Sequence, residues 1–369
     1  MNSFRGRLYS RLPITIQKFG DYLRSDEVRR LRKPVIAGYH EVQPSDDSPE
    51  CICGFHRHES FENHSISGLN LVFLWNALEG VRDSTLFRVF QSASRIASCF
   101  TGVRVAICPV QSRDLKKLQG ATVVLHKNSG LSNSAIRRLR QSSNVVLTDY
   151  VDGEHSLYLD HEVDGFICCS ATEYQWMQSH LNNRQKAYLV PHAPDDRLVG
   201  LAGSLKLDDF HCGYFGAREN CLFSRELRSL ELIDIVETRA VHEDTKFLDQ
   251  KWVEDLRQTQ FQFIARPSAQ VWPGRFKPFT KGFLSAAMNQ LVIGARFDAE
   301  NRYWLGDDYP FLVEEENLSS AIAAIDFAKQ SWKHGELDLA QATMERLRRV
   351  ACPVQNALDY RDAFIHMSR

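Results

Sequence analysis

The sequence lacks a long apolar run, an excess charge of one sign and a disulfide framework. No apolar run reaches the roughly 18 residues that a membrane-spanning helix needs. The 369 residues include 45 Lys and Arg against 46 Asp and Glu, a formal net charge of −1, which argues against nucleic-acid binding by bulk electrostatics. Nine scattered cysteines, an odd number, are typical of reduced thiols. We therefore expect a cytoplasmic protein with no nucleic-acid partner.

Metal-binding patterns are also scarce. Cys51, Cys53, His56 and His58 offer four ligands within eight positions, which is too short a span to wrap readily around a tetrahedral zinc ion. The Asp–Asp pairs lie in loop-like sequence and are typical of solvated turns. The sequence therefore predicts neither a metal nor a resident cofactor.

The first 34 residues form a basic arm with nine basic and three acidic side chains, interleaved with apolar residues. Such an arm suits peripheral contact with the anionic inner face of a membrane. Pro13 and Gly20 interrupt a long amphipathic helix, so a solvated segment packed at a domain edge is the alternative.

From residue 69 onward the sequence alternates between strand-length apolar runs and helical stretches. The strands expected in the first half are Leu69–Trp75, Val103–Ile107, Ala121–Leu125, Asn144–Leu147, Gly165–Cys169 and Ala187–Val190. The helices expected between them are Ser84–Cys99, Leu131–Gln141 and Ala171–Leu181, the last opening with a capping box at Ser170 and Glu173. Continuous apolar strands between helices predict a parallel sheet covered on both faces.

A loop-like stretch, 196–209, separates this half from a second alternation. We expect a first domain at 1–195, a second domain at 210–345 and a C-terminal segment at 346–369. The elements expected in the second domain are strands at Phe210–Phe215, Phe261–Ala265, Leu291–Gly294 and Pro310–Val313, with helices at Arg225–Val236, Lys281–Asn289 and Leu318–Trp332. The fold class is α/β, with two Rossmann-like doubly wound domains facing a cleft.

Polar residues follow several strands of the first domain. His126, Asp149 and Asp152 are candidates for a general base, because an imidazole or carboxylate near a hydroxyl can take its proton. Asp152 is the preferred candidate, since it precedes Gly153 in a loop beyond a strand end. The alternative for each residue is a cap or turn role.

The second domain carries a cationic helix start. Lys277 and Lys281 flank Thr280, a plausible N-cap, and Arg266 ends the preceding strand. Gly216 closes the first strand of this domain, where a glycine would let backbone N–H groups approach a phosphate. A helix N-terminus with several cations suits a diphosphate, although an ordinary capped surface helix is the alternative.

The segment PFTKGFLSAAMNQLVI resembles the nucleotide-sugar-binding stretch of GT-B-fold glycosyltransferases, in which Lys281 matches the family lysine. ATVVLHKN, NVVLTDYVDG and VDGFICCSATEYQ resemble the acceptor-side domain of the same group. The resemblance implies a GT-B arrangement, a C-terminal helix that crosses back to the first domain, and metal-independent transfer of a hexose or related sugar. It further implies a nucleotide-sugar donor and a saccharide or lipid-linked acceptor in surface-polysaccharide biosynthesis.

Two positions depart from the family pattern. Leu284 stands where the family has a ribose-binding glutamate, and Asn289 stands where it has a glycine. The sequence offers other carboxylates as substitutes, namely Asp298, Glu300 and Glu314–Glu316. A catalytically silent GT-B module that binds a glycan or a partner enzyme, and a nucleotide-sugar epimerase, are the alternatives to a transferase.

Overall fold

The architecture is taken from a computed structural model. It describes residues 40–41, 70–76, 83–100, 103–112, 115–116, 118–127, 131–142, 144–151, 162–198, 210–237, 251–268 and 276–367. The basic arm, the residues from Cys51 to His58 and the preferred base Asp152 lie outside this description.

The first domain is built on a seven-stranded sheet with the order β1-β3-β2-β4-β5-β6-β7. Its strands are β1 (His40–Glu41), β2 (Asn70–Trp75), β3 (Arg104–Pro109), β4 (Ala121–His126), β5 (Val145–Asp149), β6 (Gly165–Cys168) and β7 (Lys186–Leu189). β1 pairs antiparallel with β3, and the remaining pairs are parallel. Every residue of β4 is buried, as expected for a strand covered on both faces.

Helices cover both faces of this sheet. They are α4 (Asp83–Thr85), the π-helix Leu86–Gln91, α5 (Ser92–Cys99), α6 (Asn133–Gln141) and α7 (Ala171–Gln178). Leu71 and Phe73 pack with α5 on one face, whereas Val72 and Leu74 pack with α6 and α7 on the other. This division follows from the alternation of side chains along a strand. The predicted capping box is confirmed at its first bond, because the Ser170 hydroxyl accepts from the Glu173 N–H at 3.0 Å.

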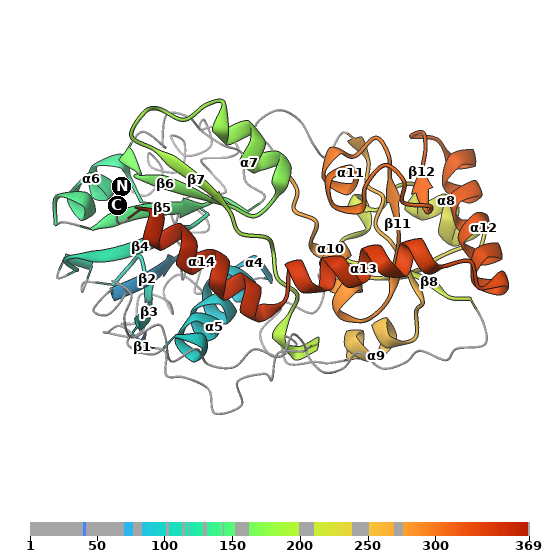
Figure 1. Ribbon diagram of the computed structural model, residues 1–369, viewed down its shortest axis with the longest axis horizontal. Coiled ribbons are helices and arrows are strands. Elements are labelled where there is room, and N and C mark those ends of the chain that lie inside the picture. The colour runs from blue at the N-terminus through green and yellow to red at the C-terminus, as the bar shows by residue number, and fades with distance from the viewer. Residues whose placement is uncertain are drawn as a thin grey trace, which may run out of the picture.

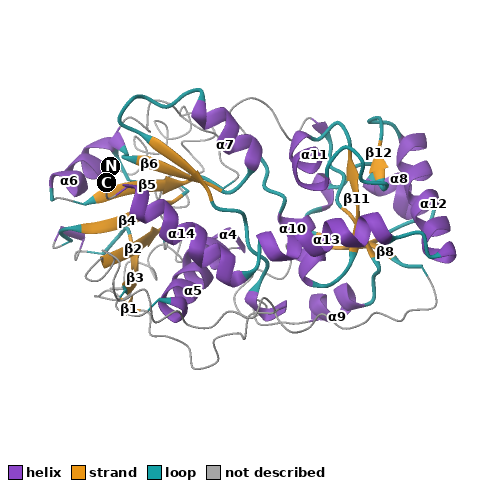
Figure 2. Cartoon of the chain, viewed as in Figure 1, coloured by secondary structure: helices purple, strands orange, loops and turns teal. Residues whose placement is uncertain are grey.

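The second domain is built on a five-stranded parallel sheet with the order β12-β11-β10-β8-β9. Its strands are β8 (Cys212–Phe215), β9 (Asp234–Val236), β10 (Phe261–Phe263), β11 (Leu291–Ala295) and β12 (Leu312–Val313). Its helices are α8 (Ser224–Ser229), α9 (Lys251–Arg257), α10 (Thr280–Ala287), α11 (Ala299–Leu305), α12 (Leu318–His334) and α13 (Asp338–Val350). Figure 2 shows strands flanked by helices in both domains.

Two local predictions for the second domain are wrong. The helix expected at Arg225–Val236 ends at Ser229, because Glu231 has a φ of 55° and the chain then enters edge strand β9. Thr280 is the first residue of α10, and Phe279 occupies the N-cap position without a side-chain capping bond. The Thr280 hydroxyl therefore does not cap this helix.

The last helix, α14 (Pro353–Met367), returns from the second domain to the first sheet, where Figure 1 shows it in red beside α5. Tyr360 packs edge-on against Phe73, with 5.8 Å between the ring centroids. The C-terminal segment thus contributes to the core of the first domain. The two sheets, parallel except for the short edge strand β1 and covered by helices, confirm the predicted fold class of two Rossmann-like domains.

Asp359 on α14 makes the stability of this packing dependent on pH. Burial raises the pKa of its carboxyl from 3.8 to about 6. The folded protein therefore binds this proton more tightly than the unfolded chain does. The resulting contribution of proton binding to the free energy of unfolding is complete below pH 3.8 and is lost as the pH rises through 6. We expect Asp359→Asn to raise the free energy of unfolding at pH 7 by about 2 kcal/mol. Urea unfolding at pH 4, 5, 6 and 7 measures the difference, which should vanish near pH 4. The exposed Asp326→Asn on α12 is the control, and an equal effect of Asp359→Asn at all four pH values would contradict the assignment.

Candidate functional site

The strand order of the second sheet reverses between β8 and β10. These two strands are neighbours although β9 lies between them in the chain. In doubly wound folds, ligands bind beyond the carboxyl ends of the strands at such a switch point. Gly216 directly follows β8, Arg266 follows β10 by three residues, and α10 begins nearby at Thr280.

Lys281 lies at this switch point. Its Nζ is 4.8 Å from the centroid of the buried Tyr214 ring, a cation–π contact, and the Tyr214 hydroxyl donates to the Ala217 carbonyl at 2.9 Å. A Cβ at Gly216 would lie 3.0 Å from this Nζ, and Gly216 has a φ of 143°. Only glycine readily adopts this backbone conformation and leaves room for the ammonium group.

The role predicted for Gly216 needs correction. Its N–H donates to the Val236 carbonyl at 3.0 Å, extending the pairing of β8 with β9. That N–H is therefore engaged and does not point to a phosphate. Gly216 instead makes space for Lys281.

Arg266 also differs from its predicted role as a phosphate ligand. Its Nε donates to Asp298 Oδ2 at 2.6 Å, and its Nη2 donates to the Lys277 carbonyl at 3.1 Å. The side chains of Arg266 and Asp298 are 14% and 5% exposed, so this ion pair is largely shielded from water. Arg266 consequently positions the segment from Phe276 to Phe279 that leads into α10.

Among the described residues, position 284 is apolar, and the carboxylates suggested as substitutes for the family glutamate are engaged elsewhere. Leu284 packs against an apolar cluster that contains Leu198, Phe215, Leu256 and Met288. The substitutes suggested by the sequence have other partners. Asp298 caps α11, Glu314 pairs with Arg296, Glu315 accepts from Asn317, and Glu316 accepts from the Ser268 N–H at 2.9 Å. Glu300 contacts the first domain.

In the first domain, Asp149 is a structural carboxylate. Its Oδ2 accepts from Arg88 Nε at 2.7 Å, and both side chains are 1% exposed. Arg88 Nη1 also donates to the Val190 and Pro191 carbonyls, at 2.8 and 3.2 Å. Burial raises the pKa of Asp149 despite the neighbouring guanidinium. A general base must reach the acceptor hydroxyl, so the candidate role of Asp149 as a base is corrected.

His126 is also enclosed. The residue is 4% exposed, and its Nε2 lies 3.4 Å from Thr85 Oγ1 and 3.5 Å from Ser84 Oγ. The parallel register places His126 directly beside Asp149 at the carboxyl edge of the sheet. Both residues thus lie at the predicted carboxyl edge of the sheet, but their side chains are buried there.

The residue directly before Asp152 in the sequence, Val151, has a strained backbone. Val151 has a φ of 65°, a conformation that β-branched residues rarely adopt. Val151 is 3% exposed, and its carbonyl accepts from the Cys169 thiol at 2.9 Å. Strain of this kind concentrates at functional sites, which keeps Asp152 as our candidate base.

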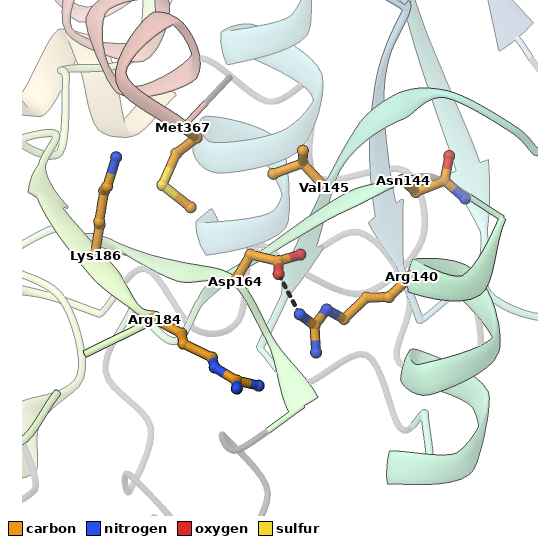
Figure 3. Close-up of a pocket in the computed structure, with 7 residues that line it drawn as sticks. All are labelled: Arg140, Asn144, Val145, Asp164, Arg184, Lys186 and Met367. Carbon is orange, nitrogen blue, oxygen red and sulfur yellow. Dashed lines mark ion pairs between the residues drawn. The ribbon is translucent and has the colours of Figure 1, made fainter. Parts of the chain in front are cut away.

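A separate pocket of about 350 Å³ lies at the amino ends of β5, β6 and β7, the opposite sheet edge from His126 and Asp149 (Figure 3). Arg140, Arg184 and Lys186 line it together with Asp164. Arg140 Nη2 pairs with Asp164 at 2.7 Å, and Lys186 Nζ donates to the His366 carbonyl at 2.7 Å. Two of the three cations are thus already engaged, and we assign no ligand to this pocket.

The described ranges hold neither a metal-binding cluster nor a membrane-spanning helix. Among those residues, no group of three or more His, Cys, Asp or Glu side chains is placed to hold a metal ion. Within the same ranges, no helix is long and apolar enough to cross a membrane. Metal independence remains a prediction.

No protein-family model matches the sequence, and no curated protein is significantly similar to it. Solved structures do match the fold. A glycosyltransferase from Rickettsia africae has 11% identity and a TM-score of 0.52 over 81% of this chain and 98% of its own. A UDP-forming trehalose-phosphate synthase from Burkholderia xenovorans, in complex with glucose-6-phosphate, has 9% identity and a TM-score of 0.51 over 81% and 100%. A sucrose-phosphate synthase from Thermosynechococcus elongatus has 11% identity and a TM-score of 0.50 over 81% and 99%. The chain therefore has the GT-B fold that its sequence motifs predict.

Proposed function

We propose that this protein transfers a sugar from a nucleotide sugar to a saccharide or lipid-linked acceptor in surface-glycan biosynthesis. The placement of Lys281 at the switch point of the second domain carries this proposal. Its ammonium group lies against Tyr214 at the carboxyl end of β8, where the fold class binds ligands. Structural neighbours that are glycosyltransferases support the same reaction class.

The chemistry follows from charge. When the bond between the sugar and the nucleoside diphosphate breaks, negative charge develops on the departing phosphate oxygen. Lys281 offsets this charge, with Lys277, the Thr280 hydroxyl and the first N–H groups of α10 as further donors. Arg266 holds the Lys277 backbone in place through its 3.1 Å hydrogen bond. In this scheme the protein supplies the positive charge, so the proposed reaction needs no metal.

A catalytically silent GT-B module is the second candidate. The observation that favours it is Leu284, which packs with Leu198 and Phe215 where the family glutamate would hold a ribose. A leucine side chain cannot bind a diol by hydrogen bonds. Under this alternative the protein binds a glycan or a partner enzyme, and nucleotides do not bind.

Isothermal titration calorimetry with UDP, GDP, TDP and CMP tests the transferase proposal. We expect one of them to bind, and we expect Lys281→Ala to weaken that affinity by about 10- to 100-fold, because a charge-assisted hydrogen bond is lost. Lys329→Ala, an exposed lysine on α12, is the matched control. Absence of binding by all four nucleotides would favour the silent module. Product analysis after incubation with a nucleotide sugar and no acceptor distinguishes an epimerase, which changes the sugar of the donor itself, from a transferase.

A further inference from the structure

The carboxylate of Glu300 joins the two domains. Glu300 lies on α11 of the second domain, and its oxygens accept from the Ala171 and Thr172 N–H groups, each at 3.0 Å, at the start of α7 in the first domain. The Thr172 hydroxyl donates to the same carboxylate at 2.7 Å, and Trp304 Nε1 donates at 2.6 Å. Glu300 is 2% exposed. A helix N-terminus favours a carboxylate at this position through its N–H groups and its dipole.

The start of α11, the helix that carries Glu300, is linked to the segment that leads into α10 and Lys281. Asp298 Oδ1 accepts from the Glu300 N–H at 3.0 Å, while Asp298 Oδ2 accepts from Arg266. Arg266 in turn donates to the Lys277 carbonyl. The segment before Lys281, the start of α11 and Glu300 are therefore linked by consecutive polar contacts within the second domain.

A second contact crosses the domain boundary beside Glu300. The rings of Trp176 on α7 and Phe276 lie 5.6 Å apart. In Figure 1, α7 and α11 face each other at the top of the boundary, whereas residues 196–198 and the junction of α13 with α14 lie lower at the boundary. There Arg95 donates to the Pro194 carbonyl at 2.7 Å and to the Asp196 carboxylate at 2.9 Å. Rotation of the domains about this lower part of the boundary would separate Glu300 from α7.

We propose that Glu300 is a positioning residue that holds the second domain, with Lys281 and the segment leading into α10, against α7 of the first domain. We call the contacts of the Glu300 carboxylate with residues 171 and 172 the latch. The latch fixes the distance between the donor phosphates at Lys281 and the acceptor side of the first domain. Domain opening, which admits the donor and releases the product, breaks the contacts of Glu300 with residues 171 and 172. The catalytic part of this inference rests on the proposed glycosyl transfer, whereas the latch itself does not.

Hydrogen exchange measured by mass spectrometry tests the latch without any substrate. We expect Glu300→Gln and Thr172→Val each to accelerate amide exchange about tenfold in both α7 and α11, because each removes a hydrogen bond to a charged group. Thr172→Val alters only the first domain and Glu300→Gln only the second. Amide exchange in the domain that does not carry the substitution is therefore the decisive measurement. Glu226→Gln, an exposed position on α8, is the control. Wild-type exchange in the unsubstituted domain of both variants would overturn the proposal. Thr172→Val also answers the question if the Glu300 variant does not fold.

Kinetics then separate the latch from the proposed function. If the protein is a transferase, both variants are expected to lose about tenfold in kcat, while nucleotide affinity changes less than twofold, because the contacts of Arg266 with Asp298 and with the Lys277 carbonyl remain in both. A merely structural weakening would not produce this split at a temperature where both variants are folded. Faster exchange without any transferase activity would retain the latch and reject the function. Unchanged amide exchange together with normal sugar transfer would reject the latch and retain the proposed function.

Discussion

Replacement of Arg88 by methionine is expected to lower the free energy of unfolding by about 3–5 kcal/mol, because it leaves a buried charge without its partner. Asp149 accepts from Arg88 at 2.7 Å, and each side chain is 1% exposed. The Tyr360 hydroxyl, 3.4 Å from the same carboxylate oxygen, cannot replace a guanidinium. The substitution also removes the donors to the Val190 and Pro191 carbonyls. Urea unfolding at pH 7 measures the loss.

The double variant Arg88→Met/Asp149→Leu is the matched control. It removes the unpaired charge together with its partner, so we expect it to be more stable than the single variant. Equal stability of the two variants would show that the carbonyl contacts of Arg88, rather than the ion pair, stabilise this region. A loss below 1 kcal/mol in Arg88→Met would contradict the buried pair itself.

Asp152→Asn is expected to lower turnover by about 10²- to 10⁴-fold if transfer inverts the configuration of the sugar, because the variant keeps the shape of the side chain but cannot accept the acceptor proton. Donor affinity should not change, since the donor cations belong to the second domain. The strained Val151, with a φ of 65° directly before Asp152, is the structural support for this position. Steady-state kinetics and nucleotide titration of one preparation measure both quantities.

Asp326→Asn, on the exposed face of α12, controls for removal of a negative charge. Near-normal turnover of a folded Asp152→Asn protein would contradict the assignment. The retaining mechanism would then be favoured, because the departing phosphate can accept the proton and no protein base is required.

Most strands of the two sheets could be predicted because they are short apolar runs. Ala121–Leu125 and Leu291–Gly294 agree with β4 and β11 to within one residue. The edge strand Asp234–Val236 could not be predicted, because few of its side chains are buried and its sequence has no clear strand alternation of apolar residues. Its sequence instead continues the helical period of α8. The N-cap at Thr280 was misplaced by one residue, because Thr is common both at N-caps and in a first helical turn.

The position of Lys281 at the sheet edge was predictable, because it depends on one local segment. Lys281 lies in the first turn of a helix that follows a strand, and that order alone brings it to the sheet edge. The roles of Arg88, Tyr214 and Glu300 depend on partners far away in the chain. Glu300 meets Ala171 across 129 positions, and Arg88 meets Asp149 across 61. The one local signal for Arg88 is a charged residue beside Val89 and Ala93 on an apolar helix face, where a buried cation requires an anion.

Crystallisation with the nucleoside diphosphate that binds most tightly tests the central claim most directly. We expect its phosphates within hydrogen-bond distance of Lys281 Nζ, beyond the carboxyl ends of β8 and β10, with the Arg266–Asp298 pair intact. A nucleotide bound elsewhere, for example in the pocket lined by Arg140 and Arg184, would contradict the account.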